Sequence, residues 1–251
     1  MPGAEPFRQD GRGERDQVGV LLQHGLTATP QMVRPVAEHL AGLGYAVSAP
    51  LLPGHGTTWR DMSRTRYDDW LAAVVRAAEE LHDDRRDLVV VGVSLGAALL
   101  SDLAVHNPDV VKGLVLVNPA FSSEDKRLKL LPVLRRVLPF IEGIADDIRR
   151  PGPPRELAYA RTPVQSLASF IDEWPRLVDQ LPRLQAPVLL MTSRHDRVVP
   201  ASSSERFAER CGSEDVTRLW LENSGHVATL DYDAPLLMER TAEFVQRVTG
   251  R

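Results

Sequence analysis

The sequence has one cysteine, three lysines and no long apolar run. With Cys211 as its only cysteine, the chain can form neither an internal disulfide nor a cysteine-based metal cluster. No stretch approaches the ~18 apolar residues of a transmembrane helix. Residues 1–16 are polar and charged, unlike the apolar centre of a signal peptide. We therefore expect a cytoplasmic protein without an integral membrane segment.

An excess of basic residues is also missing. The chain has 34 acidic and 30 basic residues, which leaves a net charge of −4. Surfaces that bind nucleic acid generally need clustered positive charge, so we predict no nucleic-acid partner. The phosphate-binding pattern G-x-x-x-x-G-K-[ST] of nucleotide enzymes is absent as well. The rest of the composition, 43% hydrophobic and 25% charged in 251 residues, is that of one large globular domain or one domain with an insertion.

Short apolar runs alternate with amphipathic stretches along most of the chain. This alternation predicts parallel strands joined by right-handed helical crossovers, and continuous apolar runs are typical of strands covered on both faces. The expected fold class is therefore α/β, with a mostly parallel open sheet and helices on both faces. The expected strands are 18–23, 45–49, 88–93, 114–118, 188–192 and 216–221. The expected helices are 30–43, 67–81, 95–106 and 234–248.

One long segment between the fourth and fifth expected strands has no strand pattern. Prolines begin two short apolar stretches in it, Pro132–Leu138 and Pro139–Ile148, and proline suits the first turn of a helix. Long insertions between sheet strands are usually functional. We expect a helical cap over 122–185, inserted into a core formed by 17–121 and 186–251. The alternative is a helical layer that only covers the edge of the sheet.

The run GVSLG at 92–96 is the motif that indicates chemistry. It reads G-x-S-x-G and lies directly after the clearest strand and before a helix, which is the setting of a nucleophile elbow. Gly92 and Gly96 lack Cβ and let the strand and the helix pack closely, while Ser94 projects from the tight turn. The alternative is a plain glycine and serine turn without a catalytic role.

A serine nucleophile needs a general base, and the base needs an acid that orients it. In this kind of fold their order along the chain is Ser, then Asp or Glu, then His. Asp196 follows the fifth expected strand and His226 follows the sixth. Both lie where the carboxyl ends of parallel strands meet, which is the edge of the sheet where open α/β proteins bind ligands. We predict Ser94, Asp196 and His226 as the catalytic residues.

Other residues compete for two of these roles. An acid located after the fourth expected strand would be Glu124 or Asp125 instead of Asp196. His24 and His55 lie in loops after the first two strands, and we expect both to brace these loops and not to transfer protons.

An oxyanion hole needs backbone N–H donors aimed at the charge of a tetrahedral intermediate. One donor is expected from Leu95, directly after the nucleophile. The second is expected from the loop HGLT at 24–27. Gly25 would let the chain turn so that the N–H of Leu26 faces Ser94. No metal or organic cofactor is required for this chemistry.

In this order, the segments HGLT, LLPGHG, GVSLG, SRHD and NSGHV make the chain resemble the α/β-hydrolase superfamily, over about residues 18–248. Within it the chain is similar to small bacterial carboxylesterases and monoacylglycerol lipases. The resemblance implies a Ser–Asp–His triad at the three residues above and a helical lid over an acyl pocket. Only the short leader precedes the first expected strand, so the two initial strands of the family are shortened or absent. Six parallel strands are expected, with the leader as a candidate edge piece.

The expected reaction is hydrolysis of carboxylic esters through an acyl-enzyme on Ser94. The apolar cap predicts short- to medium-chain acyl groups, because each buried methylene gains ~0.8 kcal/mol. The same triad would serve a thioesterase, an amidase or an acyltransferase, and a non-catalytic ligand-binding protein is the other alternative. The expected partner is a small-molecule acyl ester, and no oligomeric state is predicted. The expected substrate-binding residues are Leu26, Leu134, Leu138, Phe140, Ile141 and Ile144.

Overall fold

A seven-stranded sheet forms the centre of the protein, and the computed structural model describes residues 1–82, 87–143 and 145–251 around it. The strand order is β1-β3-β2-β4-β5-β8-β9. Six neighbouring strands run parallel and β1 pairs antiparallel with β3. The prediction of six parallel strands with an edge piece from the leader is confirmed. The strands are β1 (Phe7–Gln9), β2 (Val18–Gln23), β3 (Ala46–Ala49), β4 (Asp87–Val93), β5 (Val111–Val117), β8 (Val188–Ser193) and β9 (Val216–Leu221).

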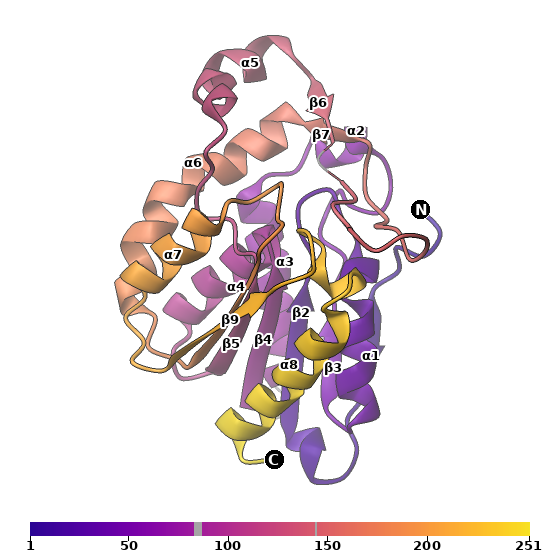
Figure 1. Ribbon diagram of the computed structural model, residues 1–251, viewed down its shortest axis with the longest axis vertical. Helices are drawn as coiled ribbons and strands as arrows, with labels where there is room; N and C mark the ends of the chain where they lie inside the picture. The colour runs from indigo at the N-terminus through magenta and orange to yellow at the C-terminus, as the bar shows by residue number, and fades with distance from the viewer. Residues whose placement is uncertain (83–86, 144) are drawn as a thin grey trace.

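Helices cover both faces of the sheet, as predicted (Figure 1). Alternate residues of β4 show why its sequence is apolar throughout. Leu88 and Val90 enter one core layer, Val89 and Val91 enter the other, and all four are fully buried. The first layer is covered by α3 (Tyr67–His82), α4 (Leu95–His106), α6 (Val164–Gln180) and α7 (Ala201–Arg210), and the second by α1 (Arg34–Gly42) and α8 (Ala234–Thr249).

The expected helix over 30–43 begins later than predicted. A 3-10 turn covers Pro30–Met32, and α1 begins only at Arg34. Pro35 explains the boundary, because a residue without an N–H fits only the first turn of a helix. Shorter elements not predicted from the sequence are α2 (Trp59–Met62) and 3-10 helices at Gly13–Gln17, Lys126–Leu130, Leu181–Arg183 and Ala228–Leu230.

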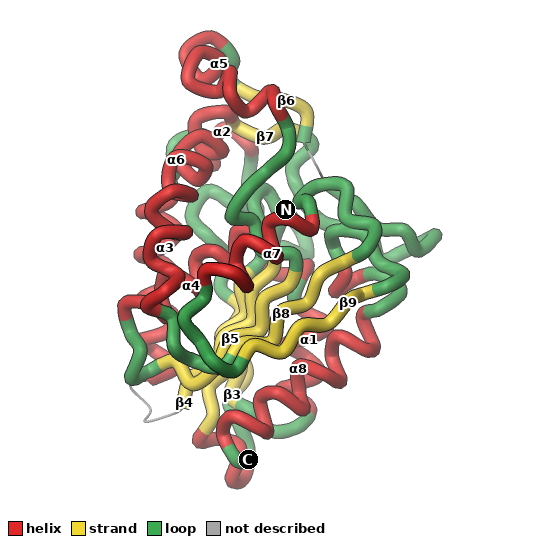
Figure 2. The backbone as a smooth tube through the Cα atoms, turned by 60° about the vertical axis from the view of Figure 1, so that its left-hand side comes forward, coloured by secondary structure: helices red, strands yellow, loops and turns green. Residues whose placement is uncertain are grey.

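The insertion after β5 contains both helix and strand. Its first predicted helix is confirmed as α5 (Leu131–Val137), but the second, over Pro139–Ile148, is wrong. There β6 (Phe140–Glu142) pairs antiparallel with β7 (Arg161–Pro163). The Phe140 ring packs on Trp59 with the ring centroids 4.9 Å apart, and this long-range contact favours the extended backbone. Figure 2 shows α5 and the β6–β7 pair beyond the end of the main sheet.

Helix α6 belongs to the insertion but packs into the core. Phe170 and Leu177 are buried in the core layer that contains α3 and α4. Arg176 of α6 binds the buried carboxylate of Asp102 on α4 at 2.7 Å, and Tyr67 of α3 donates to the same carboxylate at 3.0 Å. The insertion thus has two parts. Its tip, formed by α5 and the β6–β7 pair, lies beyond the end of the main sheet, while α6 packs into the core. None of the helices in the described part of the chain has the length and the apolar character that a membrane span needs.

The turn between β4 and α4 depends on the absence of a side chain at Gly96. A Cβ there would collide with the main-chain carbonyl oxygens of Gln23 and His24. We expect Gly96→Ala to lower the free energy of unfolding by ~3 kcal/mol, because β2 cannot move aside without losing its sheet hydrogen bonds. Urea unfolding measures this change.

The matched control is Gly42→Ala in α1, where an added Cβ meets no atom within 4 Å. Its stability should be unchanged or raised by ~0.5–1 kcal/mol. A Gly96→Ala protein as stable as the Gly42→Ala protein would contradict this account of the turn.

Candidate active site

Ser94 lies in the sharp turn between β4 and α4, at the carboxyl end of the sheet. Its backbone has φ 57° and ψ −117°, a conformation that is strained for a residue with a side chain. The Ser94 N–H donates to the carbonyl of Val117 at 3.0 Å, and close packing around Gly92 and Gly96 holds the turn. A Cβ on Gly92 would lie only 2.5 Å from the Ala97 nitrogen. The fold thus maintains a strained serine where the sequence predicts a nucleophile.

Asp196 and His226 form a buried hydrogen-bonded pair. The Nδ1 atom of His226 lies 2.7 Å from Oδ2 of Asp196, and the two side chains are only 6% and 3% exposed. The other carboxylate oxygen, Oδ1, accepts the N–H groups of Val198 and Val199, each at 2.8 Å. An ionised acceptor fixes Nδ1 as the protonated nitrogen, which leaves the lone pair on Nε2.

The competing acids have other partners. Glu124 accepts a hydrogen bond from Ser202 at 2.7 Å, and Asp125 binds the Arg127 guanidinium next to it in the chain. Of the three acids considered, only Asp196 is hydrogen-bonded to His226.

Asn118, which follows β5, joins the two loops behind this pair. Its side-chain amide donates to the carbonyl of His226 at 2.8 Å and to the hydroxyl of Ser193 at 2.9 Å, and its oxygen accepts the Ser193 N–H. The side chain is buried, so these bonds satisfy polar groups that would otherwise be costly. Asn118 lies directly after a buried strand, a position typical of site residues, but the sequence did not lead us to predict that it joins these loops.

Asp147 contacts the pair from the insertion. Its Oδ2 accepts the N–H groups of His226 and Arg197 at 3.0 Å, and its Oδ1 accepts Nε of Arg197 at 2.7 Å. Burial opposes ionisation of Asp147. The backbone N–H donors and the Arg197 guanidinium outweigh that effect and lower the pKa of the carboxyl group. No motif in the sequence pointed to this residue. It fell within the helix predicted over Pro139–Ile148, and its partners lie far along the chain.

The pKa of His226 is raised above its ordinary value. Burial lowers it, but the charge and hydrogen bond of Asp196 and the negative charges of Glu156 and Asp147 outweigh the burial. Burial also raises the pKa of Glu156, which accepts the Asp146 N–H at 2.6 Å. His226 therefore lies in a negative environment that stabilises its imidazolium form.

The predicted oxyanion segments lie beside Ser94. A Cβ on Gly25 would come within 3.3 Å of the Ser94 Cβ, so this loop passes directly over the serine. Leu26 follows, and Thr27 has φ 62° while its carbonyl accepts the Tyr159 N–H at 3.1 Å. Leu95 is the first residue of α4, where an N–H has no partner inside the helix.

His24 and His55 are buried and neutral, and they brace loops as predicted. His24 accepts the Leu52 N–H on Nε2 at 3.3 Å and donates from Nδ1 to the carbonyl of Gly25 at 2.9 Å. Nδ1 of His55 donates to the carbonyl of Pro53 at 3.1 Å. Burial lowers the pKa of His24 to about 3 and that of His55 to about 4. Neither imidazole is therefore a base matched to neutral pH.

The apolar residues predicted to bind substrate lie in different surroundings. Leu26, Leu134 and Ile141 pack around one apolar cluster, together with Leu131, Val164, Leu167, Ala168 and Ile171. Leu138 is 40% exposed. Phe140 lies between Trp59 and the Arg161 guanidinium, which is 4.3 Å from the Phe140 ring centroid. Ile144 lies outside the described residues. The cluster thus connects the loop that contains Leu26 with α5 and β6 of the insertion.

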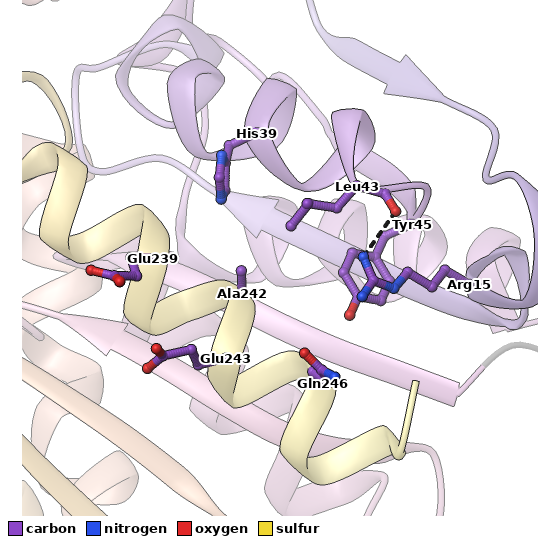
Figure 3. A pocket seen from close by; sticks show the side chains of 8 residues that line it. All are labelled: Arg15, His39, Leu43, Tyr45, Glu239, Ala242, Glu243 and Gln246. Carbon is purple, nitrogen blue, oxygen red and sulfur yellow. Dashed lines mark hydrogen bonds between the residues drawn. The ribbon is translucent and has the colours of Figure 1, made fainter.

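A hollow of about 270 Å³ lies at the opposite end of the sheet, between α1 and α8 (Figure 3). Arg15 lies against the Tyr45 ring there and donates to the carbonyl of Leu43 at 3.1 Å. The hollow contains none of the predicted catalytic residues. Among residues 1–82, 87–143 and 145–251, no group of three or more His, Cys, Asp or Glu side chains is placed to hold a metal ion.

Comparisons with known proteins agree with this fold. Residues 15–233 match a family model described as serine aminopeptidase, S33. A thermostable monoacylglycerol lipase from Bacillus sp. strain H-257 is 37% identical, over all of this chain and 97% of that protein. A solved structure of a metagenome-derived lipolytic enzyme, one of LipS and LipT, is 38% identical with a TM-score of 0.92, over 98% of this chain and 99% of that one.

A monoacylglycerol lipase from Paleococcus ferrophilus has a TM-score of 0.80 at 24% identity, over 98% of this chain and 100% of that one, and shows the shared fold. The family match spans most of the chain, and the Bacillus relative aligns along its whole length. The chain therefore belongs to the α/β-hydrolase family.

Proposed function

We propose that this chain is a carboxylic ester hydrolase of the monoacylglycerol lipase and esterase type, with Ser94, Asp196 and His226 as its catalytic triad. The observation that supports it most directly is the 2.7 Å contact of buried His226 with Asp196 at the same end of the sheet as the strained Ser94. The Bacillus monoacylglycerol lipase, 37% identical over the whole chain, supports the substrate class.

The reaction proceeds in two halves. Because Nδ1 of His226 donates to Asp196, the lone pair on Nε2 accepts the Ser94 proton as the hydroxyl attacks the ester carbonyl. The N–H groups of Leu26 and Leu95 bind the oxyanion. His226 then gives its proton to the leaving alcohol, and water hydrolyses the acyl-enzyme by the same route in reverse.

The acyl chain lies along the apolar cluster that begins at Leu26 and includes Leu134 and Ile141. Leu138 and Phe140 form the outer part of this site. In this proposal residues 122–185 act as the cap, the core consists of 17–121 and 186–251, and 1–16 are the leader. A site of this kind suits short- to medium-chain acyl groups, because each added methylene that the apolar surface buries strengthens binding until the site ends. For the place of action we propose the cytoplasm, with Cys211 as a free thiol.

The triad is tested by Ser94→Ala, His226→Ala and Asp196→Asn on nitrophenyl esters from acetate to palmitate. Ser94→Ala and His226→Ala should each lower kcat by about 10⁴-fold or more, because nucleophile and base act as one unit. Asp196→Asn should lose less but still most of the activity, since the imidazole loses its orienting anion. Thermal unfolding confirms that each variant is folded. An active Ser94→Ala protein would overturn the proposal. Activity on thioesters or amides alone would keep the triad and change the substrate class.

The pH dependence follows from the raised pKa of His226. The base must be neutral to accept the serine proton, so kcat/KM falls as the pH drops through this pKa. We expect the midpoint of that acid limb to lie above the ordinary imidazole value of ~6.5. In Asp196→Asn the residual activity should have its acid limb at lower pH, because the largest favourable charge is gone. An acid limb at the same pH in this variant and in the wild type would contradict the assignment of Asp196 as the acid that pairs with His226.

The acyl site is tested by Leu134→Trp, which adds volume inside the apolar cluster. Rates on acetate esters should be unchanged, while rates on longer chains should fall by about fourfold for each methylene excluded, or ~0.8 kcal/mol. Val137→Trp is the matched control on the same helix, where the side chain is 68% exposed. Identical chain-length profiles for the two variants would rule out this placement of the acyl chain.

A further inference from the structure

A short segment of the insertion, residues 145–150, lies against the loop that contains His226. Asp231 holds the segment in place: its carboxylate accepts the N–H groups of Arg149, Arg150 and Gly225, each at 2.8 Å. The Arg149 guanidinium also donates to the carbonyl of Asn223 at 2.9 Å. The segment between β6 and β7 is thus attached to the histidine loop by several polar contacts.

Asp147 is the residue of this segment that bonds to both loops that carry the buried pair. Its carboxylate accepts the backbone N–H of His226 itself and the backbone N–H of Arg197, which directly follows Asp196. The Arg197 guanidinium adds a charge-assisted bond to Oδ1 at 2.7 Å. Among the described carboxylates that lie outside both loops, Asp147 is the one that is hydrogen-bonded to each of them.

The main chain at Asp147 fits the histidine loop equally closely. The Asp147 carbonyl accepts the Val227 N–H at 3.2 Å. A Cβ on Gly225 would lie 2.5 Å from that carbonyl oxygen, so the glycine is needed for this approach. Asp147 therefore contacts three consecutive residues of this loop, Gly225, His226 and Val227.

We propose that Asp147 is a positioning residue for the catalytic base, which fixes the backbones of the His226 and Asp196 loops relative to each other. The inference rests on the proposed roles of His226 and Asp196. The contact between their side chains is short and buried, and its geometry depends on two loops from different strands. Catalysis is sensitive to such geometry, because a displacement of about 1 Å can cost about 100-fold in rate. On this view the insertion takes part in building the triad as well as in covering it.

Neighbouring carboxylates provide a contrast. Asp233 is also buried and holds the same loop, through the N–H of Asn223 at 2.8 Å and the hydroxyl of Ser224 at 2.9 Å. The carboxylate of Asp233 is hydrogen-bonded to these two residues, and within the described ranges it is bonded neither to His226 nor to the Asp196 loop. It is therefore the matched control for loss of a loop carboxylate.

The experiment compares Asp147→Asn with Asp233→Asn in kcat, KM and the acid limb of kcat/KM on one soluble ester. The charged groups that face His226 are Asp196, Glu156 and Asp147, and Arg197 faces Asp147. Asp147→Asn should lower kcat by about 10- to 100-fold at unchanged KM. It should also move the acid limb to lower pH, because one of three negative charges near the imidazole is removed. Asp233→Asn should lower thermal stability and leave the limb in place.

A second variant, Arg197→Gln, keeps the proposal testable if Asp147→Asn fails to fold. The Arg197 side chain is 75% exposed, so its replacement should be tolerated. It leaves the Asp147 charge uncompensated, so the acid limb should move to higher pH, while kcat falls at unchanged KM. Opposite movements of the limb in the two variants are not expected from a loss of stability alone.

Three results would overturn the inference. The first is a wild-type kcat and a wild-type acid limb of the pH profile in Asp147→Asn. The second is an equal loss of kcat in Asp147→Asn and Asp233→Asn, with the acid limb unmoved in both. The third is an unchanged kcat and an unchanged acid limb in Arg197→Gln. His226→Ala separates this failure from that of the proposed function. If His226→Ala is inactive while Asp147→Asn is normal, only the positioning role is wrong. If His226→Ala keeps full activity, the triad itself is wrong.

Discussion

The hydrogen bond between His226 and Asp196 is the interaction on which the rest of the site depends. It fixes the proton on Nδ1 and so decides which nitrogen can act as a base. Both side chains are buried, which makes the pair costly to separate and insulates it from solvent. The surrounding carboxylates favour the imidazolium form of His226. In the proposed mechanism this is the form that develops when Ser94 gives up its proton.

The parallel sheet explains how residues far apart in sequence reach this contact. Neighbouring parallel strands end at one edge, so the loops after β5, β8 and β9 bring together Asn118, Asp196 and His226. The loop after β2 and the turn after β4 meet at the same edge, where Gly25 lies next to Ser94. Strain at Ser94 is tolerated because close packing of β4 and α4 leaves the turn little freedom to relax.

Local patterns in the sequence were enough to predict the parallel sheet, and they led to the Ser–Asp–His set that we propose. Most of the parallel strands are recognisable from their apolar runs, and the predicted catalytic residues lie in the turn or loops that follow β4, β8 and β9. The strand at Phe140 was not predictable, because its partner lies about twenty residues further along the chain and its packing surface is Trp59. Asp147 was missed for a related reason. Its contacts with His226 and Arg197 are long-range, and the apolar pattern around it predicted a helix that does not form.

The measurement that tests the central claim most directly is covalent labelling with an alkyl fluorophosphonate, followed by peptide mass spectrometry. Such a probe reacts with a serine whose hydroxyl is activated by a neighbouring base. The account predicts a single adduct, located on Ser94, and slower labelling as the pH falls and His226 becomes protonated. An absence of labelling at neutral pH, or an adduct on another serine, would contradict the assignment of Ser94 as the nucleophile.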